Sequence, residues 1–222
     1  MIDATSAPVT SCAIGVDVGG SKIAAGIVDP QGRVLAKRLI ATLPDRGGEA
    51  VLHDALGLAE ALRDETRCQG WDLKALGVGV CELVDRQGRV ASSHTLPWRD
   101  LAVRERFARL APGILDADSH AAAFCETRCG TGQRFRSFLY VTLGTGIGSS
   151  LIVDGMPFLG ANGCTGELAS APMQVLDPES GAFDQRRAGE GGFRPGIGGA
   201  LQPPRSRTGS SCSGCAFRRR RE

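Results

Sequence analysis

Apolar and small or polar residues alternate near the start of the chain. The alternation covers residues 14–18, as in a pleated strand that buries one face. A second apolar run covers residues 23–28, and Gly19 and Gly20 lie between the two runs. Glycine can adopt positive φ and carries no Cβ that would obstruct a ligand. The pattern therefore predicts two antiparallel strands joined by a glycine turn.

The same kind of reading predicts the elements that follow. The predicted strands cover residues 33–42, 76–80, 137–143 and 149–153, and a small hairpin covers 84–90. Apolar spacing predicts helices over 47–67, 100–110 and 117–129. Asp118 or Ser119 is expected to cap the last helix. A glycine-rich turn is expected at 144–148, between two of the strands.

The pattern of predictable elements ends near residue 176. From residue 177 onward glycine, arginine, proline and serine dominate, and we expect no helix or strand and a disordered tail. The predicted organisation is a leader over 1–11, a first lobe over 12–117, a partial second lobe over 118–176 and a tail over 177–222.

Composition and charge exclude some partners. The 222 residues are 42% hydrophobic and 23% charged with a net charge of +2, as in a globular protein. A membrane span is not expected, because an apolar run of about 18 residues is absent from the sequence, and residues 1–11 do not resemble a signal peptide. Nine arginines between 186 and 222 could contact nucleic acid, but eleven leading residues cannot hold a helix-turn-helix, so a nucleic-acid partner is not expected.

The eight cysteines are irregularly spaced and several lie in apolar runs. We interpret them as reduced packing residues of a cytoplasmic protein. Cys212 and Cys215 form a single pair, whereas structural zinc takes four ligands, so no structural zinc is expected.

The first glycine turn has the residues of a phosphate-binding loop. The N–H groups of Gly19, Gly20 and Ser21, together with Lys22, could contact phosphate oxygens, and Asp17 could hold Mg²⁺ directly or through water. The alternative is an ordinary hairpin turn. The second glycine turn favours phosphate binding, because two such hairpins facing each other would bind a nucleotide from both sides.

The second turn carries four candidate phosphate contacts, which are Gly144, Thr145, Gly146 and Gly148. Asp118 is the candidate base for an acceptor hydroxyl, because it follows an apolar strand and begins a helix, whose N-terminus favours a carboxylate. The alternative is that Asp118 only caps its helix.

Several motifs together resemble the ROK family of sugar kinases and repressors, within the actin-like ATPase superfamily. They lie in family order over roughly residues 12–173, at 17–22, 77–80, 96–98, 118–123, 138–148, 160–163 and 166–167. The resemblance implies an α/β, actin-like (ribonuclease H-like) fold of two lobes, with an incomplete second lobe. It also implies ATP and Mg²⁺ as cofactors and a sugar as substrate, with a homodimer as one expected assembly.

In this resemblance Asp118 would deprotonate a sugar hydroxyl, and Glu167 would hold sugar hydroxyls. Thr95 stands where the family has an asparagine before its Leu-Pro-Trp motif, and His120 stands where it has a second asparagine beside the base. Both, like His94, are candidate sugar contacts, although ordinary polar roles are equally compatible with the two histidines.

Departures from the family keep two functions open. Residues 81–83 replace a Pro-Gly-Pro, Ala117 replaces an asparagine, Ser170 replaces a zinc-binding histidine, and a cysteine-rich zinc loop is not found in the sequence. The motifs that would bind the nucleotide are retained, whereas several residues that would bind the sugar are replaced. The prediction is a glucokinase-like carbohydrate kinase, and the alternative is a non-catalytic sugar-sensing protein or an inactive fragment. The tail also has the composition of a high-GC gene read in a shifted frame, which is a hypothesis.

Overall fold

The computed structural model describes residues 10–143, 147–165, 172–176, 181 and 183–187. The elements are β1 (Ser11–Val18), β2 (Lys22–Val28), β3 (Val34–Ala41), η1 (Pro44–Arg46), α1 (Gly48–Cys68), β4 (Asp72–Val80), α2 (Val103–Ala108), β5 (Gly113–Ala117), α3 (Asp118–Cys129), η2 (Thr131–Arg134), β6 (Phe138–Leu143), β7 (Ile147–Val153), β8 (Met156–Pro157), β9 (Pro172–Leu176) and β10 (Phe183–Arg187).

Five strands form one mixed sheet in the order β3-β2-β1-β4-β5. The β1–β2 and β2–β3 pairs are antiparallel, and β4 is parallel to both β1 and β5. Parallel pairs need a crossover, and here α1 connects the hairpin strands to β4 while α2 connects β4 to β5. The carboxyl ends of β1, β4 and β5 therefore lie at one edge of the sheet.

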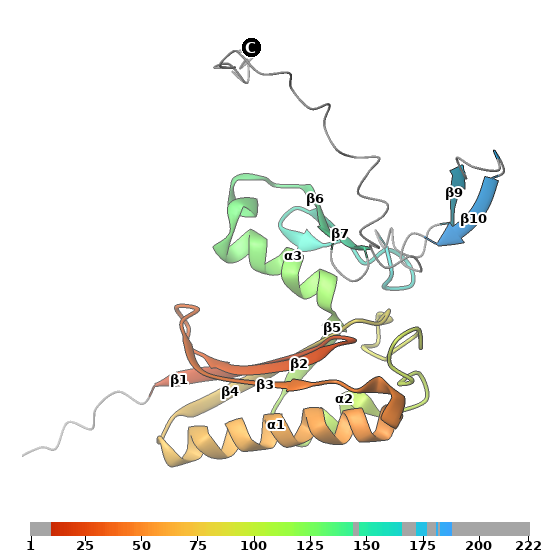
Figure 1. Cartoon of the computed structure of the whole chain (residues 1–222). Coiled ribbons are helices and arrows are strands. Elements are labelled where there is room, and N and C mark those ends of the chain that lie inside the picture. Colours follow the sequence, from red (N-terminus) through yellow and green to blue (C-terminus); the bar gives the residue numbers. More distant parts are fainter. Residues whose placement is uncertain (1–9, 144–146, 166–171, 177–180, 182, 188–222) are drawn as a thin grey trace, which may run out of the picture.

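The core lies between this sheet and α1. Every second residue of β1, of β2 and of the second half of β4 is buried, and these side chains pack in one cluster with the buried aliphatic residues of α1 between Val51 and Leu62. Burial of each such aliphatic side chain contributes about 1.5–3 kcal/mol. Figure 1 shows α1 and α2 on one side of the sheet.

The other face of the sheet has small side chains. Gly15, Ala24, Gly26 and Gly77 alternate with the buried residues of their strands, and a Cβ built on Gly15 or Gly77 would meet no atom within 4 Å. Figure 1 shows α3 and the β6–β7 hairpin on this side. Gly15, Ala24, Gly26 and Gly77 line one pocket together with residues of α3 and β6.

Helix α3 packs against a second, three-stranded sheet in the order β6-β7-β8. Residues Leu139, Val141 and Leu143 of β6 lie on its outer face and are 50%, 44% and 68% exposed. The β9–β10 pair forms a separate antiparallel hairpin. Among the described residues, no helix is both long and apolar enough to cross a membrane.

The predicted hairpin, the third strand, the first helix and the 84–90 hairpin are confirmed, the last as a bridge between Val84 and Val90. Strand β4 is longer than the predicted 76–80. The prediction missed its first half because that half mixes polar and apolar residues, and only the second half is apolar. Helix α2 is shorter than predicted, starting at Val103 rather than at residue 100.

Three expectations are wrong. Helix α3 has Ala117 as its N-cap and Asp118 as its first helical residue, so neither Asp118 nor Ser119 caps it. Gly148 is not in a turn but in β7, opposite Thr142. Strand β10 lies in the stretch where no strand was expected, because its pairing with β9 supplies order that its own composition does not.

Candidate active site

The first glycine turn is held by neighbouring segments. The Gly19 amide donates to the Lys22 carbonyl at 3.0 Å, so that N–H is used within the turn. The Thr42 hydroxyl donates to the Gly19 carbonyl at 2.6 Å, and the Thr42 amide donates to the Ser21 carbonyl at 3.1 Å. Ser21 and Lys22 are exposed. The turn is thus fixed from behind, with the serine and lysine side chains facing outward.

The glycines in this turn serve close approach and not unusual backbone geometry. Neither Gly19 nor Gly20 has positive φ, although glycine could adopt it; among the described glycines, positive φ occurs at other positions. A Cβ on Gly20 would lie 2.7 Å from Cγ2 of Thr95. Glycine at this position therefore lets Thr95 pack on the backbone of the turn.

Two carboxylates flank Gly79 on the small-residue face of the sheet. Asp17 of β1 and Asp116 of β5 are both in register with Gly79 of β4, which lies between them. Surrounding atoms partly bury the Asp17 carboxyl and raise its pKa, and the charge of Lys22 opposes this shift. Asp17 remains exposed to solvent on this face, so its oxygens are accessible to a ligand.

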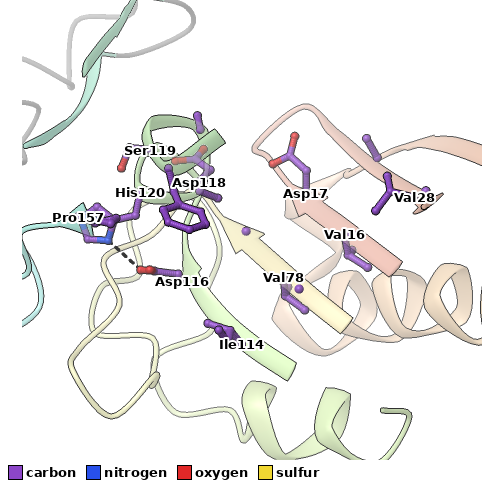
Figure 2. Close-up of a pocket in the computed structure, with 18 of the residues that line it drawn as sticks. Val16, Asp17, Val28, Val78, Ile114, Asp116, Asp118, Ser119, His120 and Pro157 are labelled. Atoms are coloured by element: carbon purple, nitrogen blue, oxygen red, sulfur yellow. Dashed lines mark hydrogen bonds and ion pairs between the residues drawn. The ribbon is translucent and has the colours of Figure 1, made fainter. Parts of the chain in front are cut away.

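Asp118 lies at the same edge of the sheet, at the start of α3. A Cβ on Gly79 would lie 3.5 Å from the Cα of Asp118, so the glycine allows the start of the helix to approach β4. Asp118 is partly buried. Figure 2 shows Asp17 and Asp118 at the same end of the pocket, with Asp118 between Asp17 and His120.

His120 is the third residue of α3, two residues after Asp118, and is only 1% exposed. Its Nδ1 lies 2.8 Å from Oδ1 of Asp116, which also accepts from the Ala117 amide at 2.8 Å (Figure 2). This pairing holds the imidazole ring in one orientation. The predicted sugar contact is therefore a buried side chain that lines the pocket.

The pocket has a volume of about 890 Å³ and lies between the small-residue face of the five-stranded sheet and residues of α3, β6 and β8. Asp17, Asp118, Ser119 and His120 line one end, and apolar side chains such as Val28, Ile114, Phe124 and Pro157 line most of the rest. Gly19, Gly20, Ser21, Lys22 and Thr95 are not among its lining residues. The pocket thus brings together Asp17 and Asp118, while the first turn and Thr95 lie beside it.

The second hairpin is described on both sides of its turn. A Cβ on Gly148 would lie 3.7 Å from Cβ of Ser119, which places the start of β7 against the start of α3, next to Asp118. The predicted contacts Gly144, Thr145 and Gly146 lie outside the described residues, as does Glu167. For these four residues the assigned roles remain predictions.

Cys81 follows β4 and lies near the carboxylates of Glu82, Asp118 and Asp17. Its amide donates to the Val18 carbonyl at 3.1 Å, which joins the carboxyl ends of β4 and β1. Burial, and then the charges of Glu82, Asp118 and Asp17, raise the pKa of the Cys81 thiol from 9.0 to about 12. The shift reflects first the burial of the thiol and then the carboxylates around it.

We expect this environment to protect Cys81 from alkylation. Because the thiolate is the reacting species, native protein at about pH 9 should alkylate Cys81 on the order of 100-fold more slowly than exposed cysteines. Exposed Cys68 and Cys129 serve as internal controls. Peptide mass spectrometry after timed iodoacetamide treatment measures the rates. Replacement of Asp118 by Asn should speed the reaction at Cys81, and equal rates at Cys81 and Cys68 would contradict the assigned environment.

The comparisons with known proteins agree with this geometry. A model of the ROK family matches residues 13–194. The chain belongs to the ROK family. The match extends past residue 173, where the sequence resemblance was expected to end, and it includes β10. Residues 188–222 lie outside the described residues, so the disordered tail and the shifted reading frame remain predictions.

Several curated relatives of this chain are sugar kinases. A glucokinase of Streptomyces coelicolor is 34% identical over 143 residues, which cover 63% of this chain and 43% of the relative. An N-acetyl-D-glucosamine kinase of Citrobacter koseri is 30% identical over 189 residues, covering 80% of this chain and 58% of the relative. This ROK chain therefore spans about half the length of the curated relatives it matches.

A solved structure confirms the actin-like α/β fold. The ROK glucokinase from Streptomyces griseus, in complex with glucose and AMPPNP, has a TM-score of 0.65 and 32% identity. The similarity covers 78% of this chain and 55% of that chain.

Sequence reasoning missed two acidic residues of this ROK protein. Asp116 has no role in the sequence analysis, but it is the last residue but one of β5 and orients His120. Glu82 was noted only as a departure from a family motif, and it is buried with several hydrogen bonds. Both follow or end an apolar strand at the carboxyl edge of the sheet, which is the signal that could have identified them.

The donors present fit a magnesium ion that also binds phosphate. Among the residues described, no three His, Cys, Asp or Glu side chains group as a complete metal site. Mg²⁺ is usually held by one or two carboxylates together with substrate phosphates and water. Asp17, which is exposed at the end of β1, has the chemistry for this role. The Cys212 and Cys215 pair lies outside the described residues.

Proposed function

We propose that this protein transfers the γ-phosphoryl group of ATP to a sugar hydroxyl. The observation that carries the proposal is the meeting of Asp17 and Asp118 at one end of the pocket, with the end of the β6–β7 hairpin packed beside Asp118. Phosphoryl transfer needs groups that position the phosphates and a base for the attacking hydroxyl. Asp17 and the glycine hairpins would position the phosphates, and Asp118 would be the base.

Asp118 is proposed as the base. It accepts the proton of the sugar hydroxyl as the hydroxyl oxygen forms its bond to the γ-phosphorus, and the bond to the leaving ADP oxygen breaks. The N-terminus of α3 stabilises negative charge at this position. The ring of His120, which Asp116 orients, extends the same wall of the pocket.

The nucleotide phosphates are proposed to bind between the two glycine hairpins. Ser21 and Lys22 contact them from the first hairpin, with the exposed amine of Lys22 as the cation. Asp17 would hold Mg²⁺, which would neutralise charge on the phosphates. From the second hairpin, residues 144–146 and Gly148 are proposed to contact the same phosphates.

The sugar is proposed to be a hexose or an N-acetylhexosamine, on the basis of the substrates named for the relatives. Thr95, His120 and Glu167 are the proposed sugar contacts. We place the reaction in the cytoplasm, which is supported by the free thiols of Cys125 and Cys129, one helical turn apart on α3. A homodimer is part of the proposal and is measured by light scattering after size exclusion.

A coupled assay for ADP release tests the proposal. We expect turnover with at least one of glucose, mannose, N-acetylglucosamine and N-acetylmannosamine, and none when ATP or Mg²⁺ is omitted. A cooperative thermal transition shows that the preparation is folded. A folded protein without turnover on any sugar would overturn the kinase. Calorimetric sugar binding would then identify a sugar-sensing protein, and absence of binding would identify an inactive fragment. The names of the relatives favour the kinase over the regulatory alternative.

A further inference from the structure

A buried carboxylate lies just outside the pocket, at the carboxyl end of β4. Glu82 is 4% exposed. Its Oε1 accepts from the amides of Thr95 at 2.5 Å and Leu96 at 2.7 Å. Its Oε2 accepts from the His94 amide at 3.0 Å and from the Ser92 hydroxyl. Three consecutive amides thus converge on one carboxylate.

This arrangement is an anion-binding loop whose anion is supplied by the chain itself. Consecutive backbone N–H groups that point to one centre bind anions. Burial of a carboxylate is unfavourable by several kcal/mol unless hydrogen bonds replace its hydration. The four donors meet this need, so the segment 92–96 is folded around the side chain of Glu82.

The same segment forms the wall next to the first glycine turn. Thr95 packs on Gly20, with Cγ2 2.7 Å from the position a Cβ would take. His94 and Thr95 are exposed, although their amides bind a buried group. The backbone next to Glu82 is itself tied to the turn, because the Cys81 amide donates to the Val18 carbonyl. Glu82 therefore connects the end of β1 to the wall that carries Thr95.

We propose that Glu82 is a positioning residue of this site. It sets the place of Thr95 and His94 relative to Gly20, and through them it shapes the sugar side of the site without touching the substrate. The effect on the sugar rests on the proposed function, whereas the effect on the segment 92–96 does not.

The chain offers a matched control in Asp85. Its Oδ1 accepts from the amides of Gln87 and Arg89, each at 2.9 Å, so it also organises a turn through backbone N–H groups. That turn is part of the 84–90 hairpin. Glu82→Ala and Asp85→Ala therefore remove comparable carboxylates, of which only the first faces the wall beside Gly20.

Hydrogen exchange on the whole chain is the first measurement. In Glu82→Ala we expect the amides of His94, Thr95 and Leu96 to exchange on the order of 100-fold faster, because their acceptor is lost. Formate, which fits the space of the lost carboxylate, should restore protection, whereas chloride at equal ionic strength should not. Asp85→Ala should leave these three amides unchanged. Unchanged exchange in Glu82→Ala, or the absence of rescue by formate, would overturn the positioning role.

Steady-state kinetics is the second measurement. We expect Glu82→Ala to raise the KM for the sugar about tenfold and to change the KM for ATP less than about twofold, with partial rescue by formate. A parallel rise of both values, or the same change in Asp85→Ala, would overturn the effect on the sugar. If the parent protein shows no turnover, the proposed function fails, and the exchange experiment still decides the role of Glu82.

A second variant covers the case in which Glu82→Ala does not fold. Glu82→Gln keeps the size of the side chain but places an NH₂ donor against amides that need an acceptor. Its one amide oxygen can replace either Oε1, which accepts from Thr95 and Leu96, or Oε2, which accepts from His94. We therefore expect faster exchange at one or two of these three amides, and wild-type protection of all three in Glu82→Gln would overturn the proposal.

Discussion

Replacement of Asp118 by Asn is expected to reduce kcat for sugar phosphorylation by about 10²–10⁴-fold, the range that a positioned base contributes. Asparagine has the shape of aspartate but cannot accept the proton of the hydroxyl. The pocket places Asp118 at the end where Asp17 also lies, so the change removes a reacting group from the proposed site. The coupled assay with the preferred sugar measures the loss.

The substitution should leave the rest of the protein intact. Asp118 is the first residue of α3, where loss of its charge against the helix dipole changes stability by only about 0.3–1 kcal/mol. The KM for ATP should stay within about twofold, because a base for the sugar acts after the nucleotide has bound. A fall in kcat with unchanged ATP binding is therefore the expected signature.

Asp64→Asn is the matched control. Asp64 lies on α1 with its side chain 59% exposed, and its ion pairs with Arg63 and Arg67 are on the surface. We expect no change in kcat for this variant. An Asp118→Asn enzyme that retains kcat within about twofold would contradict its role as base and would leave Asp17 and Asp116 as the remaining carboxylates near this end of the pocket.

Replacement of Trp98 by Ala is expected to lower the free energy of unfolding by about 3–5 kcal/mol, the range for removal of a large buried aromatic side chain. Trp98 is fully buried, and its Nε1–H donates to the Gly48 carbonyl at 2.9 Å. A Cβ on Gly48 would lie 2.4 Å from the Pro97 carbonyl oxygen, so helix and loop are in close contact here. The substitution opens a cavity between the start of α1 and the loop that carries Thr95.

Urea denaturation of Trp98→Ala and Trp98→Phe separates packing from hydrogen bonding. The Phe variant keeps most of the ring but leaves the Gly48 carbonyl without its donor, and should lose about 1–3 kcal/mol. Trp71→Phe, at a half-buried position, is the control and should change stability less than either. A loss below about 1 kcal/mol in Trp98→Ala would contradict the role of this contact, since that is the ordinary size of a substitution effect.

The local pattern of the chain was sufficient to predict most elements of the five-stranded sheet and its helices. Alternation in β1 and β2 predicts which face is buried, because successive side chains of a strand point to opposite sides. Helical spacing predicts α1 for the same local reason. The motifs around Asp17 and Asp118 were also visible, and the family match confirms the resemblance that they carry.

The meeting of distant residues was decided by tertiary structure alone. Asp17 and Asp116 flank Gly79 because three strands pair in parallel register, and no local pattern specifies that register. Strand pairing likewise decides the place of Gly148, which lies opposite Thr142, and the existence of β10, which pairs with β9. Glu82 is the clearest example. Its sequence position shows only a polar residue after a strand, whereas the fold brings four donors to its carboxylate and places Thr95 against Gly20.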